Sequence, residues 1–152
     1  MTSKTEIQAD VDALVGLTDA DLETELGRRL EQTNKELKGN EPLSATRGMG
    51  PTVDRAVLMA VPASVRKIAE RFLTKFNRQM YSLICDNTDP DHAQIQSAAA
   101  QGANALGYAI SGALVVSFGW LPGIATVIAV IIAKRAAKAG YQAFCETWKE
   151  QL

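Results

Sequence analysis

The sequence predicts an all-α protein, a helical bundle of about five to six helices that ends in a long apolar helical hairpin. Three observations predict this class. Apolar residues recur at helical spacing in successive segments, helix start and stop signals separate these segments, and forty-one consecutive residues, Ala93 to Ala133, include no charged side chain. A chain of 152 residues is long enough to bury a core of its own.

Residues 1–39 are predicted to form an acidic N-terminal helical hairpin. Ser3 and Glu6 have the spacing of a capping box, and a second start signal follows at Thr18. The second helix carries a narrow apolar stripe on a heavily charged surface, made of Leu22, Leu26, Leu30 and Leu37. Such a helix either docks a partner or lies at the periphery of its own domain, and we favour the peripheral position.

Residues 40–51 are predicted to be a linker or loop, because they contain two prolines and two glycines and no periodic apolar residues. This segment divides the acidic N-terminal hairpin from a helical domain over residues 52–152. Charge changes sign across it: residues 1–43 carry five basic and ten acidic residues, whereas residues 44–84 carry seven basic and two acidic. The net charge of −1 gives no reason to expect nucleic acid as a partner.

Residues 63–84 are predicted to form a basic amphipathic helix. Its polar face carries Arg66, Lys67, Arg71, Lys75 and Arg78, opposed by a single acid, Glu70. Helices of this kind lie on anionic membranes or enter partner grooves. The alternative, slightly favoured, is that the apolar face belongs to the core and that the cations pair with the acidic N-terminal helices.

No metal, cofactor or catalytic site is predicted. The acidic turn before the hairpin lacks the glycine and the distal glutamate of a calcium loop, so Asp89 and Pro90 are interpreted as the start of the next helix. His92 is the only histidine in the chain. Cys85 and Cys145 are too few and too far apart for a metal or disulfide framework, so we expect them to be free thiols of a cytoplasmic protein. The chain is therefore not predicted to be an enzyme.

The uncharged tract is predicted to form a helical hairpin over residues 89–151. Gly119 suits the left-handed position that ends a helix and Pro122 suits the first turn of the next, so the chain reverses between them. Each arm, predicted as one helix, would be roughly 40 to 45 Å long at a rise of about 1.5 Å per residue.

Each arm carries a ladder of small side chains at every fourth position, which lets two helix backbones approach closely. These seam residues are Ala99, Ala103, Gly107 and Ser111 in the first arm and Ala125, Ala129, Ala133 and Ala137 in the second. The remaining faces are large and apolar and must be covered by protein or by lipid. The β-branched run before Ala133 has poor helix propensity, so its surroundings must stabilise it.

The hairpin has an apolar tip and a cationic base. The tip residues are Phe118, Trp120, Leu121 and Pro122, and the base residues are Lys134, Arg135 and Lys138. The apolar part of the second arm, residues 121–133, would span about 20 Å of the roughly 30 Å of bilayer hydrocarbon. Inserted tip first, the hairpin would place its basic residues at the membrane interface as snorkelling anchors. This geometry permits insertion without requiring it.

An apolar hairpin with a tip containing glycine and proline, surrounded by amphipathic helices, resembles in architecture the hydrophobic hairpin of pore-forming colicins. The resemblance covers less than half of the chain and implies a hairpin that is sheathed until it is released into a bilayer. We therefore expect a membrane-active protein, a pore-forming or holin-like effector that binds lipid and self-associates through its seams. The alternative is a soluble all-α module for protein interaction or structure, with the hairpin as its buried core.

Overall fold

The computed structural model describes residues 4–37, 63–86 and 92–151, and this part of the chain is built from helices without strands. The helices are α1 (Lys4–Val15), α2 (Asp19–Leu37), α4 (Ala63–Lys75), α5 (Asn77–Cys85), α6 (His92–Ala99), α7 (Ala103–Phe118), α8 (Pro122–Ala139) and α9 (Tyr141–Glu150). The all-α class is confirmed, with more helices than predicted. The predicted linker, residues 40–51, lies outside the described residues.

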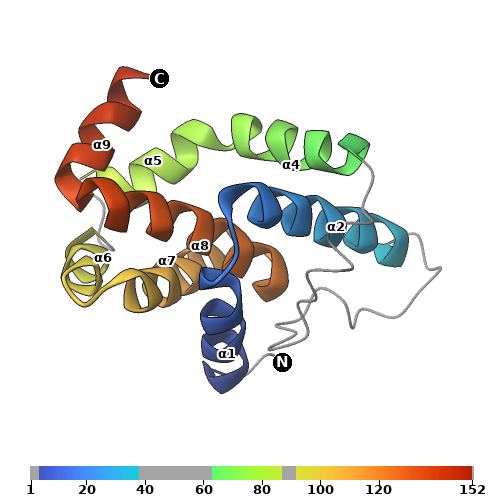
Figure 1. Cartoon of the computed structure of the whole chain (residues 1–152), viewed down its shortest axis with the longest axis horizontal. Helices are drawn as coiled ribbons and strands as arrows, with labels where there is room; N and C mark the ends of the chain where they lie inside the picture. The colour runs from blue at the N-terminus through green and yellow to red at the C-terminus, as the bar shows by residue number, and fades with distance from the viewer. Residues whose placement is uncertain (1–3, 38–62, 87–91, 152) are drawn as a thin grey trace.

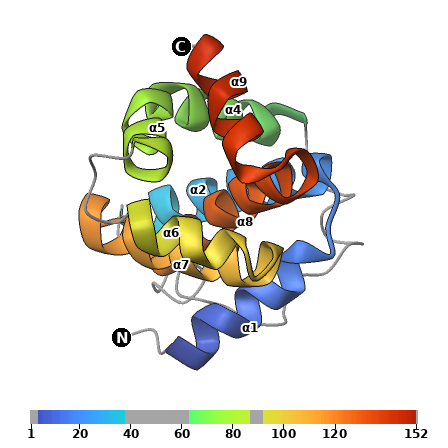
Figure 2. The same cartoon turned by 90° about the vertical axis from the view of Figure 1, so that its left-hand side faces the viewer.

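The helices lie in three layers (Figures 1 and 2). The middle layer contains α2 and α8, which contact each other. One outer layer contains α4, α5 and α9, and the opposite layer contains α1, α6 and α7. The middle layer therefore has helices on both sides, and α8 packs against α1, α2, α7 and α9.

The second arm of the hairpin occupies the centre of the fold. Every residue of α8 from Gly123 to Ala133 is buried, which means that the helix is covered on all of its faces. A helix without a polar face is expected in a protein core or in a membrane. Here the neighbouring helices supply the cover, and this stabilises a β-branched sequence of weak helix propensity.

The hairpin turn lies where it was predicted. Helix α7 ends at Phe118, Gly119 follows with a left-handed backbone (φ 67°), and its N–H donates to the carbonyl of Val115. Pro122 then begins α8. The left-handed conformation costs glycine little because it has no Cβ atom, so this position ends the helix cleanly.

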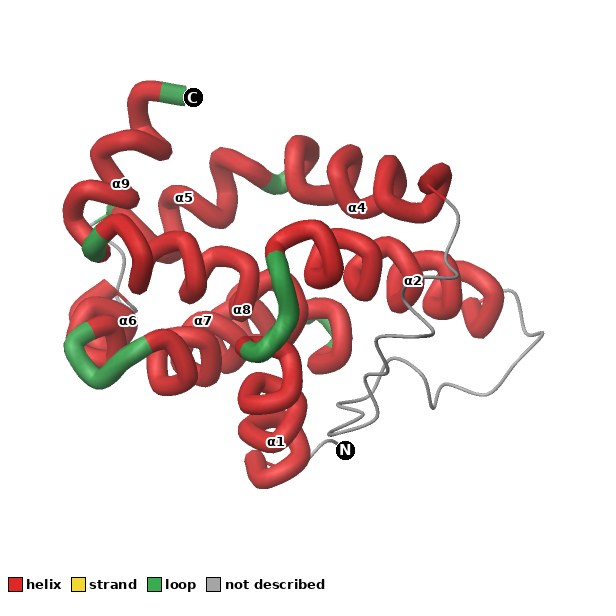
Figure 3. Tube along the Cα trace, in the orientation of Figure 1, coloured by secondary structure: helices red, strands yellow, loops and turns green. Residues whose placement is uncertain are grey.

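The prediction that each arm is one helix is wrong. Gly102, with φ 109°, separates α6 from α7, and Gly140, with φ 89°, separates α8 from α9. Both backbone conformations are outside the helical region and favour glycine. The paired helices α7 and α8 are therefore about 24 and 27 Å long, not the expected 40 Å or more. The tube in Figure 3 shows both breaks as short loops.

The basic amphipathic segment 63–84 is likewise two helices, α4 and α5. The break falls at Phe76, whose backbone (φ −102°, ψ 11°) leaves the helical region. The ring of Phe76 packs against Trp120 at a centroid distance of 5.1 Å. The change of direction thus coincides with a contact between this segment and the hairpin tip.

Among the residues that the structure describes, no helix is both long enough and apolar enough to cross a bilayer.

Candidate interaction surface

The hairpin tip is packed against α4 and the junction between α4 and α5. The ring of Trp120 lies 5.1 Å from Phe72, 5.1 Å from Phe76 and 5.0 Å from Phe118, measured between centroids, and all four side chains are half-buried. Leu121 and Pro122 are half-buried as well. Aromatic pairs at these separations attract one another beyond the area that they bury. The tip residues, which were predicted to enter a membrane first, are therefore packed within the fold.

The small-residue seam joins α7 to α8, and its middle is buried. A Cβ atom added to Gly107 would lie 3.7 Å from the Cβ of Ala133 and 3.3 Å from a methyl group of Val11 in α1. Ser111 and Thr126 share a buried hydrogen bond of 3.2 Å between their hydroxyl groups. Burial varies along the ladder: Gly107, Ser111, Ala125, Ala129 and Ala133 are buried, Ala99 and Ala103 are half-buried, and Ala137 is exposed. Self-association through the buried part would require the hairpin to open.

The base cations contact α2 and the α1–α2 turn. Lys134 donates a hydrogen bond to the carbonyl of Leu17, and Arg135 pairs with Glu23 at 3.5 Å. Of these three base cations, only Lys138 is exposed and has no charged partner within the described part of the chain. Two of the three predicted interfacial anchors are thus engaged in intramolecular contacts.

A basic ridge runs along the outer surface of α4 and α5, and we define it as Lys67, Arg71, Lys75 and Arg78. All four side chains are exposed, and none has an acidic partner within the described part of the chain. Successive members are three or four residues apart, which places them on one face of consecutive helices. The side chain of Arg66 lies outside the described part. The expected pairing with the acidic N-terminal helices is not found for the ridge.

A buried ion network, made of Asp10, Glu25, Arg28 and Arg29, joins three helices at the start of α8. Arg29 is fully buried, and its guanidinium donates to both carboxylate oxygens of Asp10 at 2.8 and 3.0 Å and to Glu25 at 2.5 Å. It also donates to the carbonyl of Gly123 at 2.8 Å. The fork of the guanidinium suits such multiple acceptors. The network therefore ties α1 and α2 to the tip of the hairpin.

The charges in the network stabilise each other. Burial alone raises the pKa of Glu25, but hydrogen bonds and charges from Arg28 and Arg29 outweigh it and hold that pKa below its usual value of 4.5. Burial alone lowers the pKa of Arg29, yet Asp10 and Glu25 raise it overall. Arg28 donates to Glu25 at 2.7 and 2.6 Å. The network holds two acids and two bases, so its formal charge is balanced.

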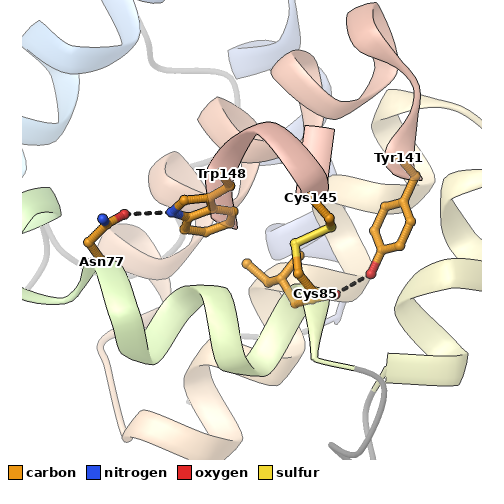
Figure 4. The surroundings of a disulfide bond; sticks show 6 residues. Asn77, Cys85, Tyr141, Cys145 and Trp148 are labelled. Atoms are coloured by element: carbon orange, nitrogen blue, oxygen red, sulfur yellow. Dashed lines mark hydrogen bonds between the residues drawn. A yellow bond between two sulfur atoms is a disulfide. The ribbon is translucent and has the colours of Figure 1, made fainter. Parts of the chain in front are cut away.

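The expectation of two free thiols is wrong, because Cys85 and Cys145 form a disulfide that joins α5 to α9 (Figure 4). Their Cα atoms are 5.5 Å apart although 60 positions separate them in sequence. Helix α9 has two further attachments to α5. Tyr141 donates to the carbonyl of Ile84, and the indole of Trp148 donates to Asn77 at 2.7 Å. Burial raises the pKa of Tyr141 to about 12.

The disulfide counts against the expected cytoplasmic compartment, because disulfide bonds persist mainly in oxidising surroundings. The cytoplasmic location itself stays a prediction.

Helical position is the sequence signal for the ion network. Asp10 follows Ile7 by three residues, and Arg29 follows Leu26 by three, so each charge falls on the apolar face of its helix. Opposite charges on two apolar faces indicate a buried pair. The disulfide offered no such signal, because only the packing of α5 beside α9 brings the two cysteines together.

Comparison of the chain with protein-family models, curated proteins and solved structures found no match. The part of the chain that the structure describes holds no group of three or more histidine, cysteine, aspartate or glutamate residues placed to bind a metal ion. The candidate site is therefore defined by the physical character of the surface alone, and the basic ridge is its most distinctive feature.

Proposed function

We propose that the chain is an all-α protein-interaction module in which the apolar hairpin is the core and the basic ridge binds an acidic protein partner. The observation that carries the proposal is the row of four exposed cations on α4 and α5 that lack acidic partners among the described residues. An acidic surface would neutralise this row without any rearrangement of the fold.

The surroundings of the ridge favour a protein partner over a membrane. An amphipathic helix binds a bilayer by burying its apolar face in the lipid. In α4 that face is already occupied: Ala69 is buried, and Phe72 packs against Trp120. The ridge can therefore offer charge to a partner but little apolar surface, which suits electrostatic docking.

A charge-reversal experiment with matched controls tests the proposal. The variant Arg71→Glu/Lys75→Glu removes the centre of the ridge, and Lys138→Glu/Lys149→Glu makes the same change of charge on α8 and α9. The probe is a glutamate-rich helical peptide, with vesicles of phosphatidylserine and phosphatidylcholine tested in parallel. The ridge variant should bind the peptide about tenfold more weakly, and the control should bind like the wild type. Equal weakening in both variants contradicts a specific surface.

The second candidate is the membrane-active form, a pore-forming or holin-like effector, and one observation favours it. Helix α8 has no charge from Pro122 to Ala133, and other helices bury it from Gly123 to Ala133, as they would in a hairpin stored before release. Release would break the Arg29–Gly123 and Lys134–Leu17 hydrogen bonds. Flotation with the phosphatidylserine vesicles tests this candidate, and vesicle binding that Trp120→Glu abolishes would favour it over the interaction module.

Self-association also stays a prediction. Because the middle of the small-residue seam is buried between α7 and α8, a dimer of the intact fold would need a different surface.

A further inference from the structure

We propose that the Cys85–Cys145 disulfide is a site of thiol–disulfide exchange, and that its reduction releases α9 from the bundle. This inference is independent of the basic ridge, which lies on α4 and α5 and would keep its charges in either redox state. The co-reactant is a small thiol, two molecules of which together supply two electrons, and glutathione is the probe.

The disulfide is accessible from the surface. Both cysteines are half-buried and line an open groove of about 710 Å³. The other lining residues are Tyr81, Asp86, Gln96, Tyr141, Gln142 and Lys149. Exchange requires a thiolate to reach one sulfur atom, so a disulfide at the wall of an open groove is a suitable target, whereas one enclosed in a core is not.

The surroundings distinguish the two sulfur atoms. Cys85 is the last residue of α5, where the negative end of the helix dipole and the following Asp86 disfavour a thiolate. Cys145 lies within α9, one turn before Lys149, and both line the groove. Residues four apart share a helix face, so the ammonium of Lys149 favours a thiolate on Cys145. Glu146 is exposed on a different face of α9. Cys145 is therefore the better leaving group.

The exchange proceeds in two balanced steps. The thiolate of the first glutathione attacks Sγ of Cys85, forming a mixed disulfide and breaking the Cys85–Cys145 bond, whose electron pair stays on Cys145 as a thiolate. A second glutathione thiolate then attacks the glutathione sulfur of the mixed disulfide and expels the Cys85 thiolate. Two protons complete the thiols, so two glutathione molecules are oxidised to one disulfide as the protein gains two electrons.

Release of α9 would uncover apolar surface. Beside the disulfide, α9 is held to α5 by the hydrogen bonds of Tyr141 and Trp148. Phe144 and Trp148 form one wall of a cleft of about 700 Å³ whose other walls include Met80, Ile131 and Ile132. Because exposed apolar surface binds partners, reduction would change what this end of the bundle can contact.

The test combines peptide mapping with hydrogen exchange on the intact protein. The oxidised chain is incubated with reduced glutathione, quenched with acid during the reaction, and mapped by mass spectrometry. The mixed disulfide should be found on Cys85. After full reduction, amides in residues 141–150 should lose roughly tenfold or more protection relative to those of α2 and α8, whose own protection should fall only as far as the global stability does. Lys149→Gln should slow reduction a few-fold, and the control Lys138→Gln should not.

Four results would overturn the proposal: a disulfide that resists excess glutathione, an adduct confined to Cys145, a ratio of α9 to α8 protection that reduction leaves unchanged, or complete loss of protection throughout the chain. The last result would mean that the whole fold, and not only the attachment of α9, depends on the bond.

Discussion

Removal of the Cys85–Cys145 disulfide by the substitutions Cys85→Ser/Cys145→Ser should lower the free energy of unfolding by about 2 to 4 kcal/mol. The upper value follows from the 60-residue separation of the two cysteines. Loop-closure entropy gives about 3 kcal/mol for a fifteen-residue loop and about 4.7 kcal/mol for one of a hundred residues, which places this loop slightly above 4 kcal/mol. Detachment of α9 in the native state would reduce the loss, because the variant then has less ordered chain to lose.

The assay is urea denaturation followed by circular dichroism, with thermal unfolding in parallel. The midpoint temperature should fall by roughly 4 to 16 °C, since 1 kcal/mol corresponds to about 2 to 4 °C in a domain of this size. The wild type in a reducing buffer should match the variant. Ser82→Ala, at an exposed position of α5, is the control and should change stability by less than about 0.5 kcal/mol. A loss below about 1 kcal/mol, or a wild type insensitive to reductant, would refute the reasoning.

Three further predictions concern the hairpin and its ion network, and denaturant titration measures each of them. Gly107→Leu should destabilise the fold by about 1 to 3 kcal/mol because of its close neighbours, whereas Gly112→Leu, with open space around it, should be neutral or stabilising; equal effects would contradict the seam. Arg29→Met should lower the free energy of unfolding by about 3 to 5 kcal/mol, because it leaves buried carboxylates unpaired. The control Arg28→Met should lower it by about 1 kcal/mol or less, and a larger loss in Arg28→Met than in Arg29→Met would contradict the network as described. Because the folded-state pKa of Glu25 is lowered, the stability from its charge is complete above about pH 4.5 and declines as the pH falls through the folded value. The advantage of the wild type over Glu25→Gln should therefore shrink in acid, and a constant difference down to pH 2 or so would contradict this assignment.

Apolar periodicity and the helix start and stop residues were sufficient to predict the helical class and the hairpin turn. Gly119 acts through the freedom of its own backbone and Pro122 through its fixed φ, so the turn needs no knowledge of distant residues. The glycines at 102 and 140 are local signals of the same kind for the two helix breaks. They were missed because a glycine inside an apolar tract is compatible with a continuous helix or with an interruption, and tertiary packing decides between them.

The environment of the hairpin could not be predicted from the sequence, because a helix without a polar face suits a protein core and a bilayer equally well. In the described fold the second arm of the hairpin lies in a protein core, because α1, α2, α7 and α9 all contact α8. Of the predicted site residues, Trp120 packs on α4 and Arg135 pairs with Glu23, while the basic ridge remains exposed. These outcomes depend on contacts between distant segments, as does the disulfide.

Native-state hydrogen exchange of α8 tests the central claim most directly, namely that the hairpin is the core of the fold. The amides of residues 124–133 should exchange only through global unfolding, with protection that matches the free energy of unfolding from denaturant titration. That protection should be unchanged when phosphatidylserine vesicles are added. Exchange of these amides faster than those of α2, or protection that changes on contact with the vesicles, would contradict the claim.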